Sequence, residues 1–427
     1  MNGRRVAVTG LGLVSPYAVG GLEAFFDNLL NGVSAVRFLQ TDDKPRPLAM
    51  PFVTCHSFDA GEALGKPLAS MMERFSQLGV AAAFDAWADA GLSRRPEGGG
   101  AERDDWDCLW GTALGGVLAF EKGYRDMWQN GRERLSPLSV VMGMNNAVNA
   151  HLSIQLGLGG ASQSYTVACA SSAVAIGEAF RRVRSGEATV AITGGSDATL
   201  TYGVARAWDA MRLIAPGDEV TAPAACRPFA SDRRGLVLGE GAAALVLEDW
   251  EHAVQRGARI HAEMVGYGAS CDRTHLVRPE AEGQMRAIRA ALKDGGLQAD
   301  EIGYVNAHGT ATLEGDPTEV AALKMVFGER APMLPVSATK SMHGHLMGAG
   351  GAIEAVTTVM SLRQQCIAPT ANLVGRLDPA CEGVDHVFEG RREVAFGAAL
   401  SNSFAFGGSN AVLAFRRAEA ATSGGQN

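Results

Sequence analysis

The sequence contains no apolar run long enough to cross a membrane. No stretch of about 18 apolar residues occurs among its 427 residues. The first five residues, Met1-Asn2-Gly3-Arg4-Arg5, lead directly into the strand-like Val6-Ala7-Val8, so the apolar stretch of a signal peptide is missing as well. We therefore expect a cytoplasmic protein without a membrane span.

Paired cysteines and clustered basic residues are also lacking. The seven cysteines are an odd number, are scattered and form no Cys-x-x-Cys pair, which indicates reduced thiols rather than a disulfide framework or a metal site. The net charge is −8 and no basic stripe occurs, which argues against nucleic acid as a partner. Hydrophobic residues make up 47% and charged residues 20%, a composition typical of a well-packed globular enzyme.

What the sequence does contain is a repeated alternation of short strands and amphipathic helices. Strands are predicted at 6–9, 109–112, 165–168, 188–193, 260–267, 304–307, 334–337 and 411–415. Helices are predicted at 22–31, 75–90, 172–185, 283–295, 317–327 and 350–362. The alternation favours an α/β fold, and the second half restarts the pattern of the first, so we predict an internal duplication. The expected parts are halves at 1–250 and 251–417, a polar surface loop at 93–105 and a flexible tail at 418–427.

Four segments carry residue types suited to catalysis. In the first, Thr166-Val167-Ala168-Cys169-Ala170-Ser171-Ser172, a strand ends in a cysteine among small residues, just before a helix. The dipole at a helix N-terminus favours a thiolate. Cys169 is therefore a candidate nucleophile, and the alternative is a buried structural thiol.

The second segment, NAHGTAT at 306–312, again brings a polar residue from a strand end into a Gly/Thr loop. His308 is its candidate catalytic residue, and Thr310 and Thr312 can donate hydrogen bonds to a linear polar ligand. A lone histidine is more often a satisfied core or surface residue than a catalyst, so that alternative stays open.

The third segment, SATKSMHGHLMGAGG at 337–351, holds Lys340, His343 and His345 before a Gly/Ala-rich helix start. A His-x-His metal site is one interpretation, but no cysteine or carboxylate lies nearby in sequence to complete the ligand shell, so we predict no metal. The fourth segment, SNSFAFGGSN at 401–410, is a Gly-rich turn with two aromatic residues. It predicts either core phenylalanines or a backbone N–H donor combined with an aromatic gate.

The pair Gly10-x-Gly12 after the first strand resembles the beginning of a dinucleotide-binding loop. Ser15 stands where the third glycine is needed, and Pro16 follows it directly. A nucleotide-binding loop is therefore not expected here.

Taken together and in this order, the four segments resemble the β-ketoacyl-[acyl carrier protein] synthases of the bacterial type II, elongating branch. The resemblance runs from VAVTGLGLVSP at 6–16, through RPFASDRRGLVLGEGAAALVLED at 227–249, to SNSFAFGGSNAVL at 401–413. It implies a thiolase fold, in which two pseudo-duplicated α/β halves stack in five αβαβα layers. It also implies an acyltransferase that joins an acyl thioester to a malonyl thioester with loss of CO₂, in fatty acid or in specialised polyene or polyketide synthesis.

The resemblance assigns catalytic roles to residues of this sequence. Cys169 stands at the family's acyl-accepting nucleophile, and His308 and His345 stand at its two catalytic histidines. Lys340 stands at the active-site lysine, and Glu354 matches the acidic partner of that lysine. Two imidazoles that donate to an enolate oxygen would stabilise it without a metal.

Binding roles follow from the same resemblance. Phe404 matches the gating aromatic whose backbone N–H forms the oxyanion hole together with that of Cys169. Thr310 and Thr312 match the threonines that hold the phosphopantetheine arm of the acyl carrier protein. The implied partners are this carrier protein and a second chain, either a copy of the same chain or a related ketosynthase-like subunit. No cofactor is implied, because the substrates are carried on the arm of the carrier protein.

Three features depart from the family pattern. His343 stands where common members have threonine, which puts an extra imidazole beside the site. Leu138-Ser139 replaces the paired aromatics of many elongating members, so we predict that Leu114 and Ser139 line an acyl tunnel longer or wider than usual. The basic patch for the carrier protein is thin. Its candidates are Lys66, Arg74, Arg134 and Arg212.

Three other functions compete with the condensing enzyme. A non-catalytic subunit of the chain-length-factor type lacks the nucleophile, and an initiating synthase carries asparagine in place of the second histidine. A degradative thiolase uses a second catalytic cysteine near its C-terminus, but Cys366 and Cys381 lie outside Gly-rich loops. The presence of Cys169, His308 and His345 together favours the condensing enzyme.

Overall fold

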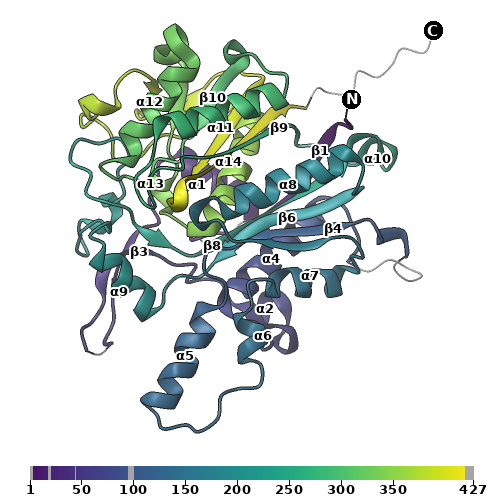
Figure 1. Cartoon of the computed structure of the whole chain (residues 1–427), viewed down its shortest axis with the longest axis vertical. Helices are drawn as coiled ribbons and strands as arrows, with labels where there is room; N and C mark the ends of the chain where they lie inside the picture. The colour runs from purple at the N-terminus through teal and green to yellow at the C-terminus, as the bar shows by residue number, and fades with distance from the viewer. Residues whose placement is uncertain (1–2, 18–20, 44, 95–100, 419–427) are drawn as a thin grey trace.

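The computed structural model describes residues 3–17, 21–43, 45–94 and 101–418. A sheet of eleven strands runs through the molecule, with helices packed on it (Figure 1). Within the described ranges, no helix is both long and apolar enough to cross a membrane. Of the predicted tail at 418–427, only residue 418 belongs to the described part, and residues 95–100 of the predicted surface loop lie outside it.

The sheet consists of one strand arrangement used twice. The first half contributes β1 (Val6–Val14), β4 (Asp107–Gly111), β5 (Ser162–Tyr165), β6 (Val190–Asp197) and β8 (Gly241–Asp249). The second half contributes β9 (Ala262–Cys271), β10 (Ile302–Asn306), β11 (Pro335–Ser337), β13 (Asp385–His386), β15 (Ala398–Phe404) and β16 (Ser409–Arg417). The strands lie in the order β5-β4-β6-β8-β1 in the first half and β11-β10-β15-β16-β9 in the second, with β13 beyond β11.

The pairing directions repeat as well. In the first half β5, β4 and β6 are parallel, whereas β8 pairs antiparallel with β6 and β1 pairs antiparallel with β8. In the second half β11, β10 and β15 are parallel, whereas β16 pairs antiparallel with β15 and β9 pairs antiparallel with β16. Strands β1 and β9 pair antiparallel and join the two halves. This repeated order is the internal duplication that the sequence predicts.

Two helices lie between the halves of the sheet. The α8 helix (Ser171–Ser185) contacts β4 and β6 of the first half and β9 and β16 of the second, and α14 (Gly350–Gln364) contacts β8 and β15. Residues 350–362 of α14 are all buried, as expected for a helix without a polar face. The outer layers are α4 (Arg74–Asp89) with α7 (Ala147–Leu156), and α11 (Ala281–Asp294) with α12 (Gly315–Phe327). One apolar core lies around the two central helices, and a separate core lies beneath each outer helix layer. The order helices, sheet half, central helices, sheet half, helices gives the five predicted layers.

The Gly10-x-Gly12 pair allows α4 to approach β1 closely. A Cβ atom at Gly10 would lie 2.1 Å from the carbonyl oxygen of Ala86, and one at Gly12 would lie 2.2 Å from that of Ala82. The glycines therefore serve helix–strand packing, in agreement with the expectation that they form no nucleotide loop.

The secondary structure differs from the sequence prediction in several places, of which three bear on the site or its surroundings. The strand predicted at 165–168 is wrong, because β5 ends at Tyr165 and a 3₁₀ turn, Ala168–Ala170, follows with Ala168 at a φ of 45°. Strand β15 was not predicted. The helices α5 (Val117–Trp128) and α6 (Ser139–Gly143) were not predicted either, and they project from the body at one end (Figure 1).

Candidate active site

Cys169 lies in the 3₁₀ turn that leads into α8, and its side chain is buried. Ser171 braces this turn, since its hydroxyl accepts from the N–H of Val167 (2.8 Å) and donates to the carbonyl of Ala168 (2.7 Å). The positive φ of Ala168 is a sparsely populated conformation of the kind found at functional sites. The turn thus fixes the thiol at the end of the helix between the two sheet halves.

The environment of Cys169 favours the thiol over the thiolate. Burial raises its pKa to about 12, against the opposing influence of the Lys340 charge. This differs from the expectation that the helix dipole would favour a standing thiolate. The Nε2 atom of His345 lies 3.1 Å from the Cys169 sulfur, so a proton acceptor is in place when the thiol reacts.

His345 is positioned by its backbone. Its N–H donates to the carbonyl of Val237 (2.7 Å), and its own carbonyl accepts from the N–H of Gly239 (3.0 Å). Its Nδ1 atom has no hydrogen-bond partner among the described residues. Burial, followed by the charge of Lys340, lowers its pKa well below the ordinary value, so the ring is neutral.

His308 follows β10 and faces His345, with the ring centroids 5.6 Å apart and the ring planes at 88°. Lys340 Nζ lies 3.3 Å from His308 Nδ1 and forms an ion pair with Glu354, all within the buried interior. An ammonium group can only donate, so Nδ1 accepts and Nε2 carries the proton of the neutral ring. Burial and then the Lys340 charge lower the pKa of His308 well below its ordinary value.

Glu319 of α12 is a site residue that the sequence prediction missed. One of its carboxylate oxygens accepts from the N–H of His308 (2.8 Å) and from the side chain of Asn402 (3.0 Å). The other accepts from the N–H of Gly309 (2.9 Å). An acidic residue in the predicted helix after the NAHGTAT loop was the available signal, but only the fold shows that it turns back to this loop.

Asp197, at the end of β6, is a second missed residue. Its carboxylate accepts from the hydroxyl of Thr112 (2.8 Å) and from the N–H groups of Ala113 (2.8 Å), Leu114 (3.2 Å) and Gly348 (2.7 Å). Burial raises its pKa to about 6. Because Gly348 belongs to the second half, Asp197 ties the two halves together beside Cys169.

The assignment of the backbone donor to Phe404 stays a prediction, and Phe406, two residues later, is a second candidate. Phe404 lies in β15 opposite Asn410, with its ring 6.0 Å from that of His308. The backbone N–H groups of Phe406 and Cys169 act to lower the pKa of the Cys169 thiol, but by less than burial raises it. The ring of Phe406 stacks on Trp208 at 5.7 Å.

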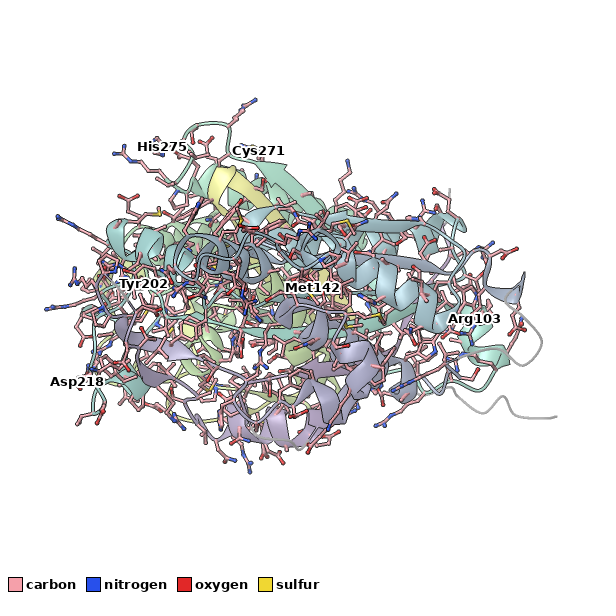
Figure 2. The ribbon with its side chains drawn as sticks, turned by 90° about the horizontal axis from the view of Figure 1, so that it is seen from below. Arg103, Met142, Tyr202, Asp218, Cys271 and His275 are labelled. Atoms are coloured by element: carbon pink, nitrogen blue, oxygen red, sulfur yellow. The ribbon has the colours of Figure 1, made fainter. Side chains whose placement is uncertain are left out.

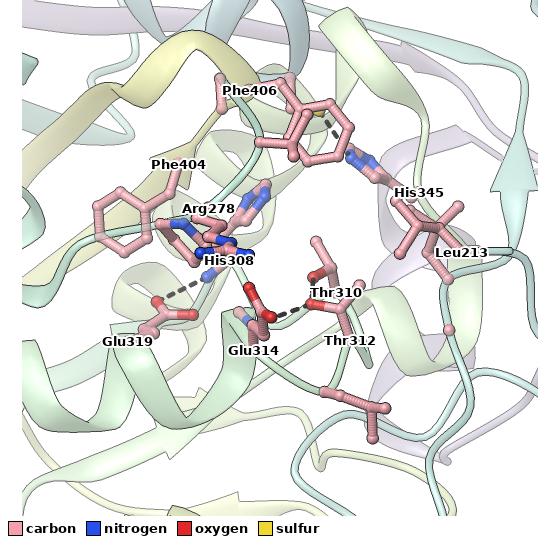
Figure 3. A pocket seen from close by; sticks show the side chains of 18 of the residues that line it. Leu213, Arg278, His308, Thr310, Thr312, Glu314, Glu319, His345, Phe404 and Phe406 are labelled. Atoms are coloured by element: carbon pink, nitrogen blue, oxygen red, sulfur yellow. Dashed lines mark hydrogen bonds between the residues drawn. The ribbon is translucent and has the colours of Figure 1, made fainter. Parts of the chain in front are cut away.

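A cavity of about 380 Å³ opens in front of these residues (Figure 3). Cys169, His308, His345 and Phe404 line its inner end. Thr310 and Thr312 line the wall, and their hydroxyl oxygens lie 3.1 Å apart. The predicted pocket residues Leu114 and Ser139 are not among the lining residues, so their role in an acyl tunnel stays a prediction.

The mouth of the cavity carries arginines and apolar side chains. Arg212, Arg234 and Arg278 line it. The loop after β9, which carries His275, projects at the molecular edge (Figure 2), and His275 Nδ1 accepts from the N–H of Arg278 (3.2 Å). Arg74, a predicted carrier contact, is instead bound to the buried Glu240 (2.7 Å). No group of three or more His, Cys, Asp or Glu side chains is arranged to hold a metal in the described part of the chain.

Comparison with known proteins places this geometry in a family. The model described as "Beta-ketoacyl synthase, N-terminal domain" matches residues 3–253, and "Beta-ketoacyl synthase, C-terminal domain" matches residues 261–374. The chain belongs to the β-ketoacyl synthase family.

Individual members of the family are similar over most of the chain. The 3-oxoacyl-[acyl-carrier-protein] synthase 2 of Staphylococcus aureus (strain COL) is 38% identical over 421 residues, which cover 98% of this chain and 99% of that protein. Nodulation protein E of Rhizobium sp. (strain N33) is 44% identical over 348 residues, 81% of this chain and 83% of that protein. The crystal structure of a β-ketoacyl synthase from Burkholderia phymatum STM815 matches with a TM-score of 0.88 and 35% identity, covering 97% of this chain and 100% of that chain. The predicted thiolase fold is thereby confirmed.

Proposed function

We propose that the chain is a β-ketoacyl-[acyl carrier protein] synthase that extends an acyl group held on Cys169 by two carbons from malonyl-carrier protein. The observation that carries the proposal is that Cys169, His308 and His345 converge at the inner end of one cavity. Relatives whose printed name is 3-oxoacyl-[acyl-carrier-protein] synthase 2 support the choice of carrier-bound substrates.

The first step transfers the acyl group to the enzyme. Cys169 gives its proton to Nε2 of His345, 3.1 Å away, as its sulfur attacks the thioester carbonyl. The N–H groups of Cys169 and Phe406 are aimed at the oxyanion that forms, and such donors typically contribute about 10²–10³ in rate each. Collapse of the tetrahedral intermediate breaks the bond to the carrier's thiol, which leaves with the proton from His345.

The second step generates the nucleophilic carbon. The bond from the malonyl methylene carbon to its carboxylate breaks, CO₂ leaves, and the electron pair stays on the thioester as an enolate. Nε2–H of His308 and Nε2–H of His345 donate to the enolate oxygen. After the first step the neutral ring of His345 carries its proton on Nδ1. Before Nε2 can donate, solvent takes this proton from Nδ1 and returns one to Nε2, and no described protein group holds Nδ1 against this exchange.

The third step forms the carbon–carbon bond. The enolate carbon attacks the Cys169 thioester, and the oxyanion is again held by the N–H groups of Cys169 and Phe406. Collapse breaks the carbon–sulfur bond, and the Cys169 sulfur regains a proton from solvent. The product is a β-ketoacyl chain on the carrier protein.

The binding partners follow from the cavity and the surface. Thr310 and Thr312 are assigned to the phosphopantetheine arm, because the arm must pass along this wall to reach Cys169. No cofactor other than that arm takes part in the proposal. A second chain of the same or a related kind is assigned to the projecting α5–α6 segment, where Phe120 (40%), Trp128 (76%) and Val140 (66%) are exposed.

A cytoplasmic location is also part of the proposal. All seven cysteines lie in the described part of the chain and none is paired, as expected in a reducing compartment.

The test is a condensation assay on the purified protein with a panel of acyl-carrier proteins and malonyl-carrier protein. We expect acyl-enzyme by mass and β-ketoacyl product, both abolished by Cys169→Ala and both retained by Cys366→Ala, which changes a buried cysteine in β12 (Cys366–Ile367). The preferred acyl donor distinguishes fatty acid synthesis from a specialised pathway. A wild-type protein that neither acylates nor condenses, alone or with a ketosynthase-like partner, would contradict the proposal.

A further inference from the structure

Of the two histidines in the KSMHGH segment, His343 is the one that the proposed reaction does not use. Its side chain is fully buried, two residues before His345 and three after Lys340. It lies in α13 (Lys340–His343), a short helix that ends at Gly344. Burying a polar ring in such a place costs free energy unless its nitrogens form hydrogen bonds.

Both nitrogens of His343 are hydrogen-bonded. Nδ1 lies 2.8 Å from the carbonyl oxygen of Gly344, and Nε2 lies 3.0 Å from the hydroxyl oxygen of Thr339. A carbonyl can only accept, so Nδ1 carries the proton. Nε2 of the neutral ring therefore accepts from the Thr339 hydroxyl. Burial lowers the pKa of His343 to about 3, so this neutral tautomer persists across the working range of an enzyme.

The two partners of His343 stand directly before the two catalytic side chains of this segment. Thr339 precedes Lys340, whose Nζ approaches His308 Nδ1, and Gly344 precedes His345, whose Nε2 approaches the Cys169 sulfur. The imidazole of His343 is thus a bridge between the backbone positions that hold Lys340 and His345.

The peptide group between Gly344 and His345 depends on hydrogen bonds to neighbouring residues for its orientation. Gly344 has a φ of 69°, and a Cβ atom there would lie 2.9 Å from Val53 Cγ2, so only glycine fits. Glycine also leaves the backbone free to rotate. The carbonyl of Gly344 belongs to the same peptide plane as the N–H of His345, which donates to Val237. His343 holds one edge of this plane and Val237 the other, which fixes the direction in which the His345 side chain leaves the backbone.

We propose that His343 is a positioning residue for the decarboxylation step, holding the Gly344–His345 peptide through Nδ1–H and the Thr339–Lys340 turn through Nε2. This inference rests on the proposed condensing function and deepens it. The enolate of the malonyl unit must meet two imidazole donors at once, and a displacement of about 1 Å at such a site can cost about 10²-fold in rate. Attack by Cys169 on the acyl donor uses only one of the two imidazoles, His345, together with the turn and the backbone N–H groups, which His343 does not touch. Loss of His343 should therefore slow acylation less than decarboxylation.

Four substitutions separate the two hydrogen bonds. His343→Asn places an amide N–H where Nδ1–H stands and keeps the bond to Gly344. His343→Gln reaches the position of Nε2 and keeps only the bond to Thr339. His343→Leu removes both bonds while filling similar space. Thr339→Val removes the donor to Nε2 and leaves the bond to Gly344 in place.

The matched control is His386→Leu. His386 is also buried, and its Nε2 lies 2.8 Å from a backbone carbonyl, that of Cys381, in a different part of the second half. Wild type, the four site variants and this control are compared in three measurements. These are the rate of Cys169 acylation by acyl-carrier protein, kcat and KM for decarboxylation of malonyl-carrier protein, and the thermal midpoint of unfolding.

We expect His343→Leu to lower kcat for decarboxylation by about 10- to 100-fold, with KM within about 3-fold of wild type and with acylation slowed by a clearly smaller factor than decarboxylation. His343→Asn should recover at least a third of the wild-type kcat, and His343→Gln should recover less. His386→Leu should leave the ratio of decarboxylation to acylation unchanged, whatever its effect on the unfolding midpoint. If His343→Leu does not fold, decarboxylation and acylation are compared in His343→Asn, His343→Gln and Thr339→Val instead.

Decarboxylation within 3-fold of wild type in His343→Leu overturns the inference. So does a fall in acylation equal to the fall in decarboxylation, because that is the result of a merely structural defect. A wild-type protein that does not condense contradicts the proposed function instead, so the two failures are distinguishable.

Discussion

His345 Nε2 lies 3.1 Å from the Cys169 sulfur, across the seam between the two halves of the molecule. The contact joins a thiol with a raised pKa to an imidazole with a lowered one. Proton transfer within this pair is therefore uphill at rest, and both groups stay neutral. The pair becomes reactive only when a bound thioester draws electron density from the sulfur.

This relationship predicts how Cys169 reacts with iodoacetamide. Because its pKa is raised to about 12, the thiolate fraction is small at neutral pH and keeps rising beyond pH 9. The alkylation rate of Cys169, followed by peptide mass, should therefore increase through pH 10 without a plateau. The exposed Cys271 serves as an internal reference in the same digest. A plateau for Cys169 below pH 8 would show a standing thiolate.

The buried pair of Lys340 and Glu354 predicts a stability effect that a double substitution reverses. Lys340→Met leaves the Glu354 carboxylate buried without a cation, which should cost about 3–5 kcal/mol in the free energy of unfolding. Lys340→Met combined with Glu354→Leu removes both charges and should recover most of this loss. Urea unfolding measures both variants, and equal stability of the single and double variants would contradict the prediction.

Glu319 is expected to matter for catalysis through His308. Glu319→Gln keeps one acceptor oxygen but places an amide donor against one of the two N–H groups of His308 and Gly309. We expect kcat for condensation to fall by about 10- to 100-fold, since the His308 donor is displaced. The control is Glu329→Gln in the 3₁₀ segment after α12, which should leave kcat unchanged. Wild-type kcat in Glu319→Gln would rule out this positioning role.

The glycines of β1 predict a packing effect on stability. Gly12→Ala puts a Cβ atom 2.2 Å from the carbonyl of Ala82 and should destabilise the fold by about 1–3 kcal/mol or more. Gly397→Ala is the matched control, because nothing lies within 4 Å of the added Cβ. Chemical unfolding curves compare the two variants. A Gly12→Ala protein as stable as the Gly397→Ala protein would mean that α4 can move away at no cost.

Much of the site is predictable because its parts are local. Cys169, His308 and His345 each lie in a short segment rich in small residues, and their order along the chain carries the resemblance to the family. Glu319 and Asp197 escaped prediction because their acceptor roles depend on groups from distant segments, such as Gly348 for Asp197. Phe404 and Phe406 are only two residues apart, and sequence alone does not show which N–H turns toward the sulfur.

The sequence predicts that the fold consists of two similar α/β halves, but it predicts the ends of individual strands and several helices less well. The alternation of strands and helices reveals two similar halves, because each strand is short and apolar. The turn at Ala168 was read as strand, since its positive φ is imposed by tertiary packing on a residue that otherwise avoids it. The α5 helix was not predicted although its residues are amphipathic, and its apolar side chains, such as Phe120 and Trp128, are exposed in this chain rather than buried in a core.

The bond from Asp197 to the N–H of Gly348 has a consequence for how such an enzyme can arise. The nucleophile comes from the first repeat and both imidazoles from the second, so neither repeat alone contains a working fraction of the site. An ancestral single repeat could have acted only as a pair of chains, each completing the other. Fusion into one chain then freed the two copies to diverge, one keeping the sulfur and the other the bases.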